Sequence, residues 1–167
     1  MPGQGSCFEI RVPLARSLAR TTAQPEAPAQ RPASSLDAQY VLCIDNEPDI
    51  LDGMAGLLQK WGAQALTAAT EEEAVTRIER LRREHHTLPA ILLVDYHLDD
   101  NVTGIEVIDT LRRVGDARLP AIILTADHSD EVTDAIRRAG YAILHKPVKP
   151  AALRALMTRV LSRRSVA

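Results

Sequence analysis

The sequence predicts a doubly wound α/β fold, in which a five-stranded parallel sheet is covered by helices on both faces. Two observations after residue 38 carry this prediction: short apolar runs alternate with amphipathic helical patterns, and the runs are apolar at nearly every position. Such alternation is typical of parallel sheets with right-handed crossovers, and continuously apolar strands are typical of sheets covered on both faces. The five runs span 41–44, 64–68, 90–94, 121–124 and 141–144.

The helical patterns between these runs have recognisable beginnings and ends. Pro48 suits the first turn of one helix, and Thr70 with Glu73 forms a capping-box pattern at the start of the next. Gly140 follows the fourth pattern, at a position where glycine commonly ends a helix. The predicted helices span 48–61, 70–84, 104–114, 129–139 and 150–162.

The composition is that of an ordinary soluble protein. The chain of 167 residues is 46% hydrophobic and 25% charged, with a net charge of −2 and 3% aromatic residues. This charge gives no general attraction to nucleic acid or an anionic membrane, and no apolar stretch approaches the roughly 18 residues of a membrane span. Cys7 and Cys43 are far apart in sequence and indicate neither a disulfide framework nor a zinc site. We therefore expect a cytoplasmic protein without nucleic-acid or direct membrane contact.

Three segments of the chain differ in character. Residues 39–165 carry the repeating pattern and form the predicted globular domain. Residues 15–38 are rich in Pro, Ala, Gln and Ser without hydrophobic periodicity, which predicts a flexible linker. Residues 1–14 contain the alternating apolar pattern of a short strand around Ile10.

Polar side chains follow four of the apolar runs. Asp45 and Asn46 follow the first, Asp95 the third, Thr125 the fourth and Lys146 the fifth. Open parallel sheets bind ligands beyond the carboxyl ends of their strands, so we expect these side chains to lie together. Carboxylates suit Mg²⁺, aspartate can act as a nucleophile toward phosphorus, and an ammonium neutralises the moving oxygens. The pattern indicates phosphoryl transfer to an aspartate.

The stretches that carry this chemistry resemble a known family. "VLCIDNEPDI", "ILLVDYHLDD", "IILTAD" and "LHKPV" are similar, in this order, to the four signature stretches of two-component receiver (response-regulator) domains. The similarity extends over residues 40 to 163 and implies a flavodoxin-like strand order of 2-1-3-4-5. It also implies that Asp95 is the phosphoacceptor, that Thr125 hydrogen-bonds the phosphoryl group, that Lys146 pairs with Asp95 or its phosphate, and that the Lys146–Pro147 bond is cis.

The resemblance implies a Mg²⁺ site, from which the sequence departs at one position. Asp45, Asp95 and the backbone carbonyl of His97 would be ligands, with Asp45 acting partly through water. Asn46 stands where most receivers have a second acid, so an amide oxygen replaces a carboxylate and we expect weaker Mg²⁺ binding. Glu47 is a candidate to contribute through a water molecule.

Positions that modulate receivers also depart from the usual pattern. The loop after Asp95 lacks the usual proline and is one residue longer. His97 and Asp127 occupy the two variable positions that tune dephosphorylation in the family. Ile143 occupies the aromatic switch position, while Tyr141, two residues earlier, is expected to point the same way. The usual coupling between the threonine and an aromatic residue is therefore in question.

The start of the chain carries a second resemblance. "GQGSCFEIRVPLA" is similar to the last glycine-containing turn and final strand of a histidine-kinase ATPase domain. Residues 1–14 are thus interpreted as a remnant of such a domain, and the chain as the C-terminal receiver of a hybrid sensor kinase. The piece itself would be a signalling phosphoacceptor rather than a turnover enzyme, while its parent, which could be membrane-attached, would be a histidine kinase.

Three functions compete for this constellation. The first is a phosphorelay switch that takes its phosphoryl group from a histidine-kinase dimerisation domain or a separate histidine phosphotransfer protein. Its output would be the face formed by the fourth helix, fifth strand and fifth helix, a surface that could also form a homodimer. The second is a pseudo-receiver that binds partners without phosphorylation, which Asn46 and Ile143 favour. The third, an aspartate-nucleophile phosphatase, requires an acid two residues after the nucleophile, where His97 stands.

Overall fold

The computed structural model describes residues 36–98 and 102–164 of the chain. The predicted kinase remnant at 1–14 and most of the predicted linker at 15–38 lie outside the described residues. Leu36 is fully buried, and the backbone N–H of Ala38 donates to the carbonyl of Gly62 at 2.9 Å. The folded unit therefore already includes the last residues of the stretch interpreted as linker.

A five-stranded sheet with the order β2-β1-β3-β4-β5 and parallel pairing throughout forms the centre of the fold. This confirms the predicted strand order 2-1-3-4-5. The strands are β1 Tyr40–Ile44, β2 Gln64–Ala68, β3 Ile91–Asp95, β4 Ala121–Thr125 and β5 Ala142–His145. The helices are α1 Pro48–Lys60, α2 Glu71–His85, α3 Gly104–Val114, α4 Asp130–Arg138 and α5 Pro150–Arg164.

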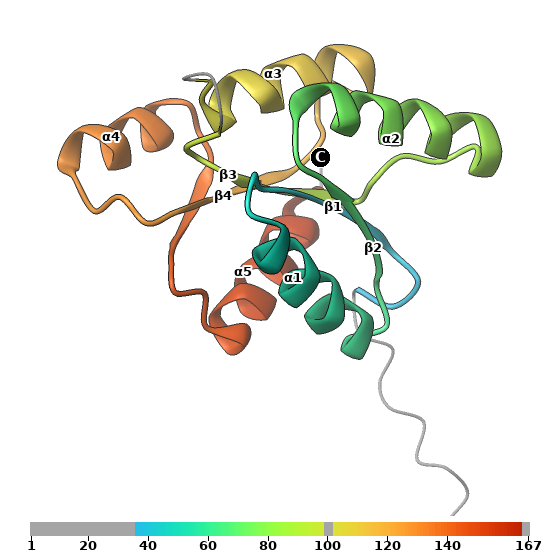
Figure 1. Cartoon of the computed structure of the whole chain (residues 1–167), viewed down its shortest axis with the longest axis horizontal. Coiled ribbons are helices and arrows are strands. Elements are labelled where there is room, and N and C mark those ends of the chain that lie inside the picture. Colours follow the sequence, from blue (N-terminus) through green and yellow to red (C-terminus); the bar gives the residue numbers. More distant parts are fainter. Residues whose placement is uncertain (1–35, 99–101, 165–167) are drawn as a thin grey trace, which may run out of the picture. The chain divides into compact units, whose positions relative to one another are not determined.

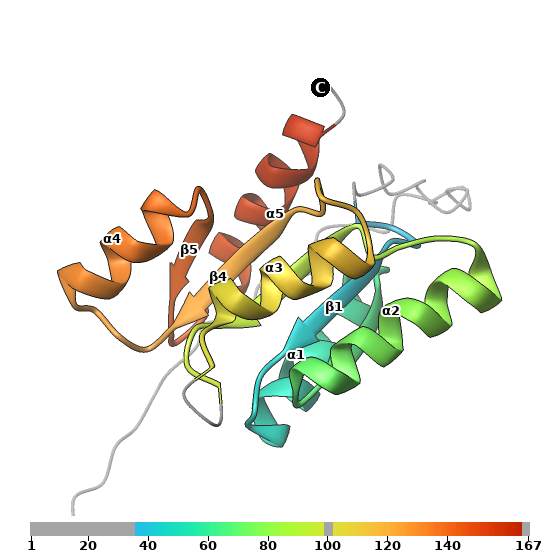
Figure 2. The ribbon, with the colours of Figure 1, turned by 90° about the horizontal axis from the view of Figure 1, so that it is seen from above.

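The helices cover the two faces of the sheet unequally. Figure 1 shows α2, α3 and α4 on one face and α1 with α5 on the other, and Figure 2 shows how the strands run between them. Each face has its own buried apolar cluster, because alternate strand residues point to opposite sides. Among the residues described, no helix is long and apolar enough to cross a membrane.

Local sequence signals explain several element ends. Thr70 Oγ1 accepts a hydrogen bond from the backbone N–H of Glu73 at 3.2 Å, as the capping pattern predicts. The Glu73 carboxylate, however, accepts from the N–H of Ala69 rather than from that of Thr70, so the reciprocal bond goes to the residue before the N-cap. Thr103 and Glu106 form a complete capping box at the start of α3, which was not predicted.

Asp95, Thr125 and His145 are the last residues of their strands rather than the first residues after them. Each continues the ladder: Asp95 is paired with Leu124, and Thr125 with His145. The backbone of the functional residues is thus fixed by sheet hydrogen bonds, which holds the side chains in defined positions.

Gly104, at the first residue of α3, allows the helix to approach the end of β3. Its N–H donates to the carbonyl of Tyr96 at 2.8 Å. A Cβ added at this position would run into the carbonyl oxygen of Asp95 and come within 3.2 Å of a Val94 methyl group. The loop after β3 therefore closes around a residue without a side chain.

We expect Gly104→Ala to lower the free energy of unfolding by about 2–4 kcal/mol, because the clash is with backbone that cannot move cheaply. Gly53→Ala in α1 is the matched control, since nothing lies within 4 Å of the added methyl group. The control should be neutral or gain up to about 1 kcal/mol from helix propensity. Chemical denaturation measures both, and equal effects of the two changes would contradict the close approach at Gly104.

Candidate functional site

The buried polar side chains of the described chain gather at the carboxyl ends of the strands, which we call the carboxyl edge. Asp45, Asp95 and Thr125 are 3%, 6% and 0% exposed, and they are the only charged or polar residues among those described that are classed as buried. They come from the ends of β1, β3 and β4. Burial of this kind is costly unless the groups are paired, so the edge is a specialised site.

Lys146 joins the two aspartates. Its Nζ lies 2.7 Å from Asp45 Oδ2 and 2.7 Å from Asp95 Oδ1. The other carboxylate oxygens accept backbone hydrogen bonds, from Glu47 N–H at 3.0 Å and from His97 N–H at 3.1 Å. The next peptide bond, Lys146–Pro147, is cis, as the resemblance implied.

One ammonium faces two buried carboxylates, and this arrangement shifts the pKa values of Asp95 and Lys146. Burial raises the pKa of Asp95, and the charge of Asp45 adds to the rise, while Lys146 and the His97 N–H oppose it. Burial alone would lower the pKa of Lys146, but its hydrogen bonds to both aspartates outweigh burial and raise it. The site is therefore one positive charge short, which favours a further cation beside the carboxylates.

The oxygen ligands at this edge fit Mg²⁺, although Asn46 offers an amide oxygen where most receivers have a carboxylate. Asp45 and Asp95 each have lone pairs beyond the hydrogen bonds described, and the set contains oxygen donors only. Within the described residues, no group of three or more His, Cys, Asp or Glu side chains is arranged to hold a metal. Two carboxylates, an amide and a backbone carbonyl suit a cation that keeps several waters.

Thr125 connects the site to the loop that precedes α4. Its Oγ1 accepts a hydrogen bond from the backbone N–H of Asp127 at 3.0 Å. Its carbonyl accepts from the N–H of Lys146 at 2.8 Å. A movement of this hydroxyl would therefore act directly on the loop at residue 127.

The two variable positions, His97 and Asp127, form a pair that the sequence did not predict. His97 Nε2 lies 3.4 Å from Asp127 Oδ2, and the side chains are 61% and 33% exposed. Hydrogen bonds from Ser129 lower the pKa of Asp127, with a smaller contribution from His97. The pair joins the loop after Asp95 to the loop after Thr125, so it borders the site from outside.

Tyr141 points to the same face of the sheet as Ile143, as predicted, but it does not reach the carboxyl edge. Its hydroxyl accepts from Arg112 Nη1 at 3.0 Å and donates to Asp109 Oδ1 at 3.0 Å. Burial raises the pKa of Tyr141 to about 12; Arg112 opposes this rise and Asp109 adds to it. The ring is thus held at the start of β5, far along the strand from Lys146.

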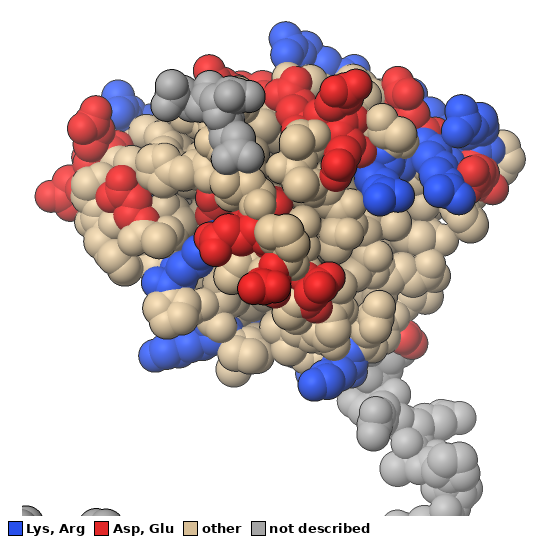
Figure 3. Space-filling model, viewed as in Figure 1, with Lys and Arg blue, Asp and Glu red and all other residues tan. Residues whose placement is uncertain are grey.

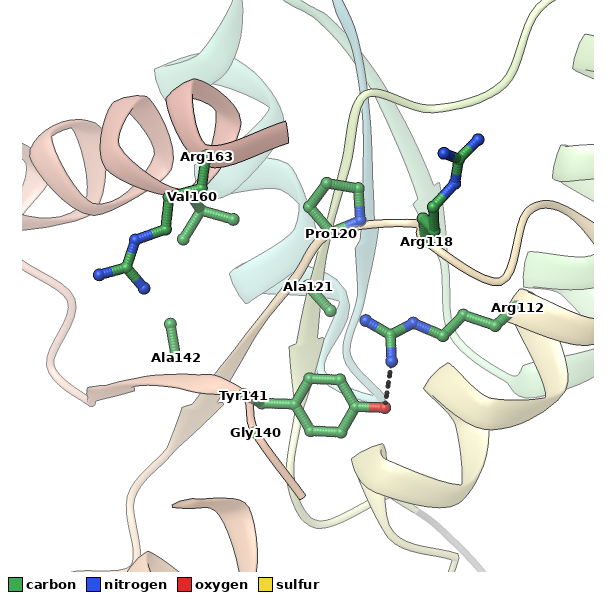
Figure 4. Close-up of a pocket in the computed structure, with 9 residues that line it drawn as sticks. All are labelled: Arg112, Arg118, Pro120, Ala121, Gly140, Tyr141, Ala142, Val160 and Arg163. Atoms are coloured by element: carbon green, nitrogen blue, oxygen red, sulfur yellow. Dashed lines mark hydrogen bonds between the residues drawn. The ribbon is translucent and has the colours of Figure 1, made fainter. Parts of the chain in front are cut away.

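A pocket of about 460 Å³ lies beside this tyrosine and is shown in Figure 4. Arg112 and Tyr141 meet at its wall, while Arg118 and Arg163 point away from that contact (Figure 4). None of the predicted site residues lines it. Because it lies at the amino ends of β4 and β5, it is separate from the carboxyl edge.

A second pocket of about 290 Å³ borders the site itself, and we call it the α1 groove. It combines one face of α1 with the segment after β5, including Lys146. Its lining residues are Asp49, Ile50, Gly53, Met54, Leu57, Leu124, Lys146, Pro147 and Val148. The sequence did not predict this groove, because its two walls are almost a hundred residues apart along the chain.

Comparison with known proteins decides the family. The model of the response regulator receiver domain matches residues 41–158, which is most of the chain. The chain belongs to the response regulator receiver family. The four strand-end stretches therefore identified the family correctly.

Individual receivers and their relatives agree with this membership. A CheY-like receiver domain from Methanospirillum hungatei has a TM-score of 0.65 at 25% identity, over 77% of this chain and 98% of that one. An uncharacterized 14.6 kDa protein of Leptolyngbya boryana is 33% identical over 66% of this chain and 80% of its own length. The nitrogen assimilation regulatory protein NtrX of Azorhizobium caulinodans is 28% identical over 74% of this chain but only 26% of its own length.

We expect Asp95→Asn to stabilise the fold at neutral pH and to raise the melting temperature by a few degrees. The raised pKa of Asp95 means that its ionised form is less favourable in the folded chain than in the unfolded chain. The free-energy cost of ionising Asp95 in the folded chain is absent below the unfolded pKa of about 3.9 and is fully present above the folded pKa. The stability gained by Asp95→Asn should therefore vanish on acidification.

Thermal unfolding from pH 3.5 to 7.5 measures this difference. Asp52→Asn on exposed α1 is the control and should change stability by less than about 0.5 kcal/mol at every pH. A lower melting temperature for Asp95→Asn at pH 7 would contradict the stated balance of charges.

Proposed function

We propose that this receiver accepts a phosphoryl group from phosphohistidine onto Asp95 as one step of a two-component phosphorelay. The observation that carries the proposal is the contact of Asp95 Oδ1 with Lys146 Nζ at 2.7 Å, inside a buried cluster that also contains Asp45 and Thr125. A nucleophilic carboxylate, an ammonium and a hydroxyl at one edge are the groups that such a transfer needs.

The reaction is a displacement at phosphorus. An Asp95 carboxylate oxygen forms a bond to phosphorus while the bond between phosphorus and the donor's imidazole nitrogen breaks, and that nitrogen keeps the electron pair. Lys146 neutralises charge on the moving group, and Thr125 donates a hydrogen bond to it. Asp45, Asp95, the His97 carbonyl and Asn46 would hold Mg²⁺, which would supply further positive charge to the site. Lys146 moves from its bridging position as the phosphoryl group enters.

The α1 groove supports a helical phosphodonor. It is lined largely by apolar side chains and includes Lys146 of the carboxyl edge, so a helix seated there could bring its own histidine to that edge. A histidine-kinase dimerisation domain or a separate histidine phosphotransfer protein would provide such a helix. The α4–β5–α5 face would then be the output surface and a site for a homodimer.

The proposal extends to the parent protein and to the class of partner. The stretch at 1–14 supports a hybrid sensor kinase as the parent, and the receiver would then work on the cytoplasmic side. On the face shown in Figure 3, acidic and basic side chains are intermixed over α2. Such a mixed surface favours protein partners over the nucleic-acid backbone.

The alternative is a pseudo-receiver, a module that binds its partner without phosphorylation. Asn46 in the metal set and the absence of an aromatic residue at Ile143 favour it. The paired, buried Asp95 and Lys146 weigh against it, because a binding module would have no need to maintain a carboxylate whose pKa is raised by burial.

Acetyl phosphate with Mg²⁺, or a cognate kinase, should add one phosphoryl group to the chain. Asp95→Asn should abolish the modification, and removal of Mg²⁺ by a chelator should suppress it. Intact-mass spectrometry measures the gain, and loss of the group in hydroxylamine marks it as an acyl phosphate. Asp52→Asn should be modified like the wild type. No modification with either donor would leave the pseudo-receiver as the better explanation.

Asn46→Asp should increase Mg²⁺ affinity by about tenfold, because it adds a carboxylate to a site that is already rich in oxygen ligands. Isothermal titration of both proteins gives the two dissociation constants. Gln59→Glu, which makes the same amide-to-carboxylate change at an exposed position of α1, is the control. Equal affinities of wild type and Asn46→Asp would remove residue 46 from the metal site.

A further inference from the structure

The path from the phosphorylation site to α4 cannot use the aromatic residue that is usual in receivers. Ile143 stands at that position, half-buried in the cluster under α4. Tyr141 is fixed at the other end of β5 by its hydrogen bonds to Arg112 and Asp109. A coupling between the loop before α4 and β5 would therefore need another contact.

His128 and His145 form such a contact. Their imidazole rings are stacked, with centroids 4.5 Å apart and planes inclined by 22°. His128 lies in the loop between β4 and α4, and His145 is the last residue of β5. His145 follows Ile143 by two residues on the strand, so its ring faces the side of the sheet that α4 covers.

A short chain of hydrogen bonds links this stack to Thr125. Thr125 is paired with His145 in the ladder, and its Oγ1 accepts from Asp127 N–H at 3.0 Å. Asp127 Oδ1 accepts from Ser129 N–H at 2.7 Å, and Ser129 Oγ caps α4 at the N–H of Val132. His128 stands between Asp127 and the N-cap Ser129, so it moves with any displacement of this loop.

The stacked arrangement leaves one polar atom unsatisfied. Among the described residues, His145 Nδ1 is the buried side-chain nitrogen or oxygen without a hydrogen-bond partner. A buried polar atom without a partner raises the free energy of the arrangement that contains it. An arrangement that gives His145 Nδ1 a partner would remove this cost, which would favour movement of the two rings.

We propose that the His128–His145 stack couples Thr125 to α4 in this receiver and performs the role of the absent aromatic residue at 143. When the Thr125 hydroxyl turns toward a phosphoryl group on Asp95, it releases Asp127 N–H, the loop shifts, and His128 leaves His145. The start of α4, capped by Ser129, shifts with the loop. This coupling rests on the proposed function, because it needs a phosphoryl group at Asp95 to move Thr125.

Beryllofluoride with Mg²⁺, an analogue of the phosphoryl group, provides the test. Backbone amide shifts of residues 130–138 are recorded by NMR with and without the analogue. Wild type should show clear shifts in α4, whereas His128→Ala and His145→Ala should reduce them by ~3-fold or more while still binding the analogue. His128→Phe should retain the shifts, because an aromatic ring can replace the stack.

Controls separate the coupling from general damage to the fold. His86→Asn removes an exposed imidazole far from the site, and Ile143→Ala removes the side chain at the usual switch position; both should keep the α4 shifts. The double variant His128→Ala/His145→Ala should behave like either single variant, because the rings act as one unit. Circular dichroism confirms that each variant is folded.

The possible results distinguish the two proposals. If wild type binds no analogue and accepts no phosphoryl group, the proposed function falls and the coupling falls with it. If the analogue binds and His128→Ala transmits shifts to α4 as strongly as wild type, only the coupling is overturned. Loss of the α4 shifts in Ile143→Ala but not in His128→Ala would return the role to position 143.

Discussion

The bridge from Lys146 to two buried aspartates is the interaction on which the functional edge of this receiver depends. Three chain segments meet at one ammonium, with distances of 2.7 Å to each carboxylate. Without that ammonium, Asp45 and Asp95 would be two buried carboxylates with no compensating charge, and their repulsion would destabilise the contact between the carboxyl ends of β1 and β3. The same ammonium holds Asp95 in place where a phosphoryl group would arrive. Structure and chemistry therefore rely on a single side chain.

The topology and the membership of the carboxyl edge were predictable because both follow from period and order along the chain. Continuously apolar runs that alternate with helices permit few arrangements, and all of those place strand ends together. The sequence pattern alone thus places a polar residue that ends an apolar run, such as Asp95 or Thr125, at this edge of the sheet. The strand ends themselves were slightly misplaced, because ladder hydrogen bonds extend over these polar residues.

Contacts between side chains of different loops were not predictable from the sequence. The pairing of His97 with Asp127 and the stacking of His128 on His145 depend on loop conformations that no periodicity encodes. The role of Gly104 was hidden for the same reason, since only the folded loop brings it against the Asp95 carbonyl. Sequence patterns locate residues on elements, whereas such contacts depend on how the elements are joined.

The connections around Thr125 indicate why this receiver can depart from its family at several positions at once. The hydroxyl of Thr125 holds the loop at Asp127, and the backbone of the same residue is paired with His145. A ring placed on that loop and a ring placed on that strand can therefore meet without any aromatic residue at position 143. If the proposals above hold, an amide at Asn46 would change the charge beside Asp95 and would leave the route through the two histidine rings intact. Metal affinity and coupling to α4 would then be carried by different residues, so each could change in sequence without loss of the other.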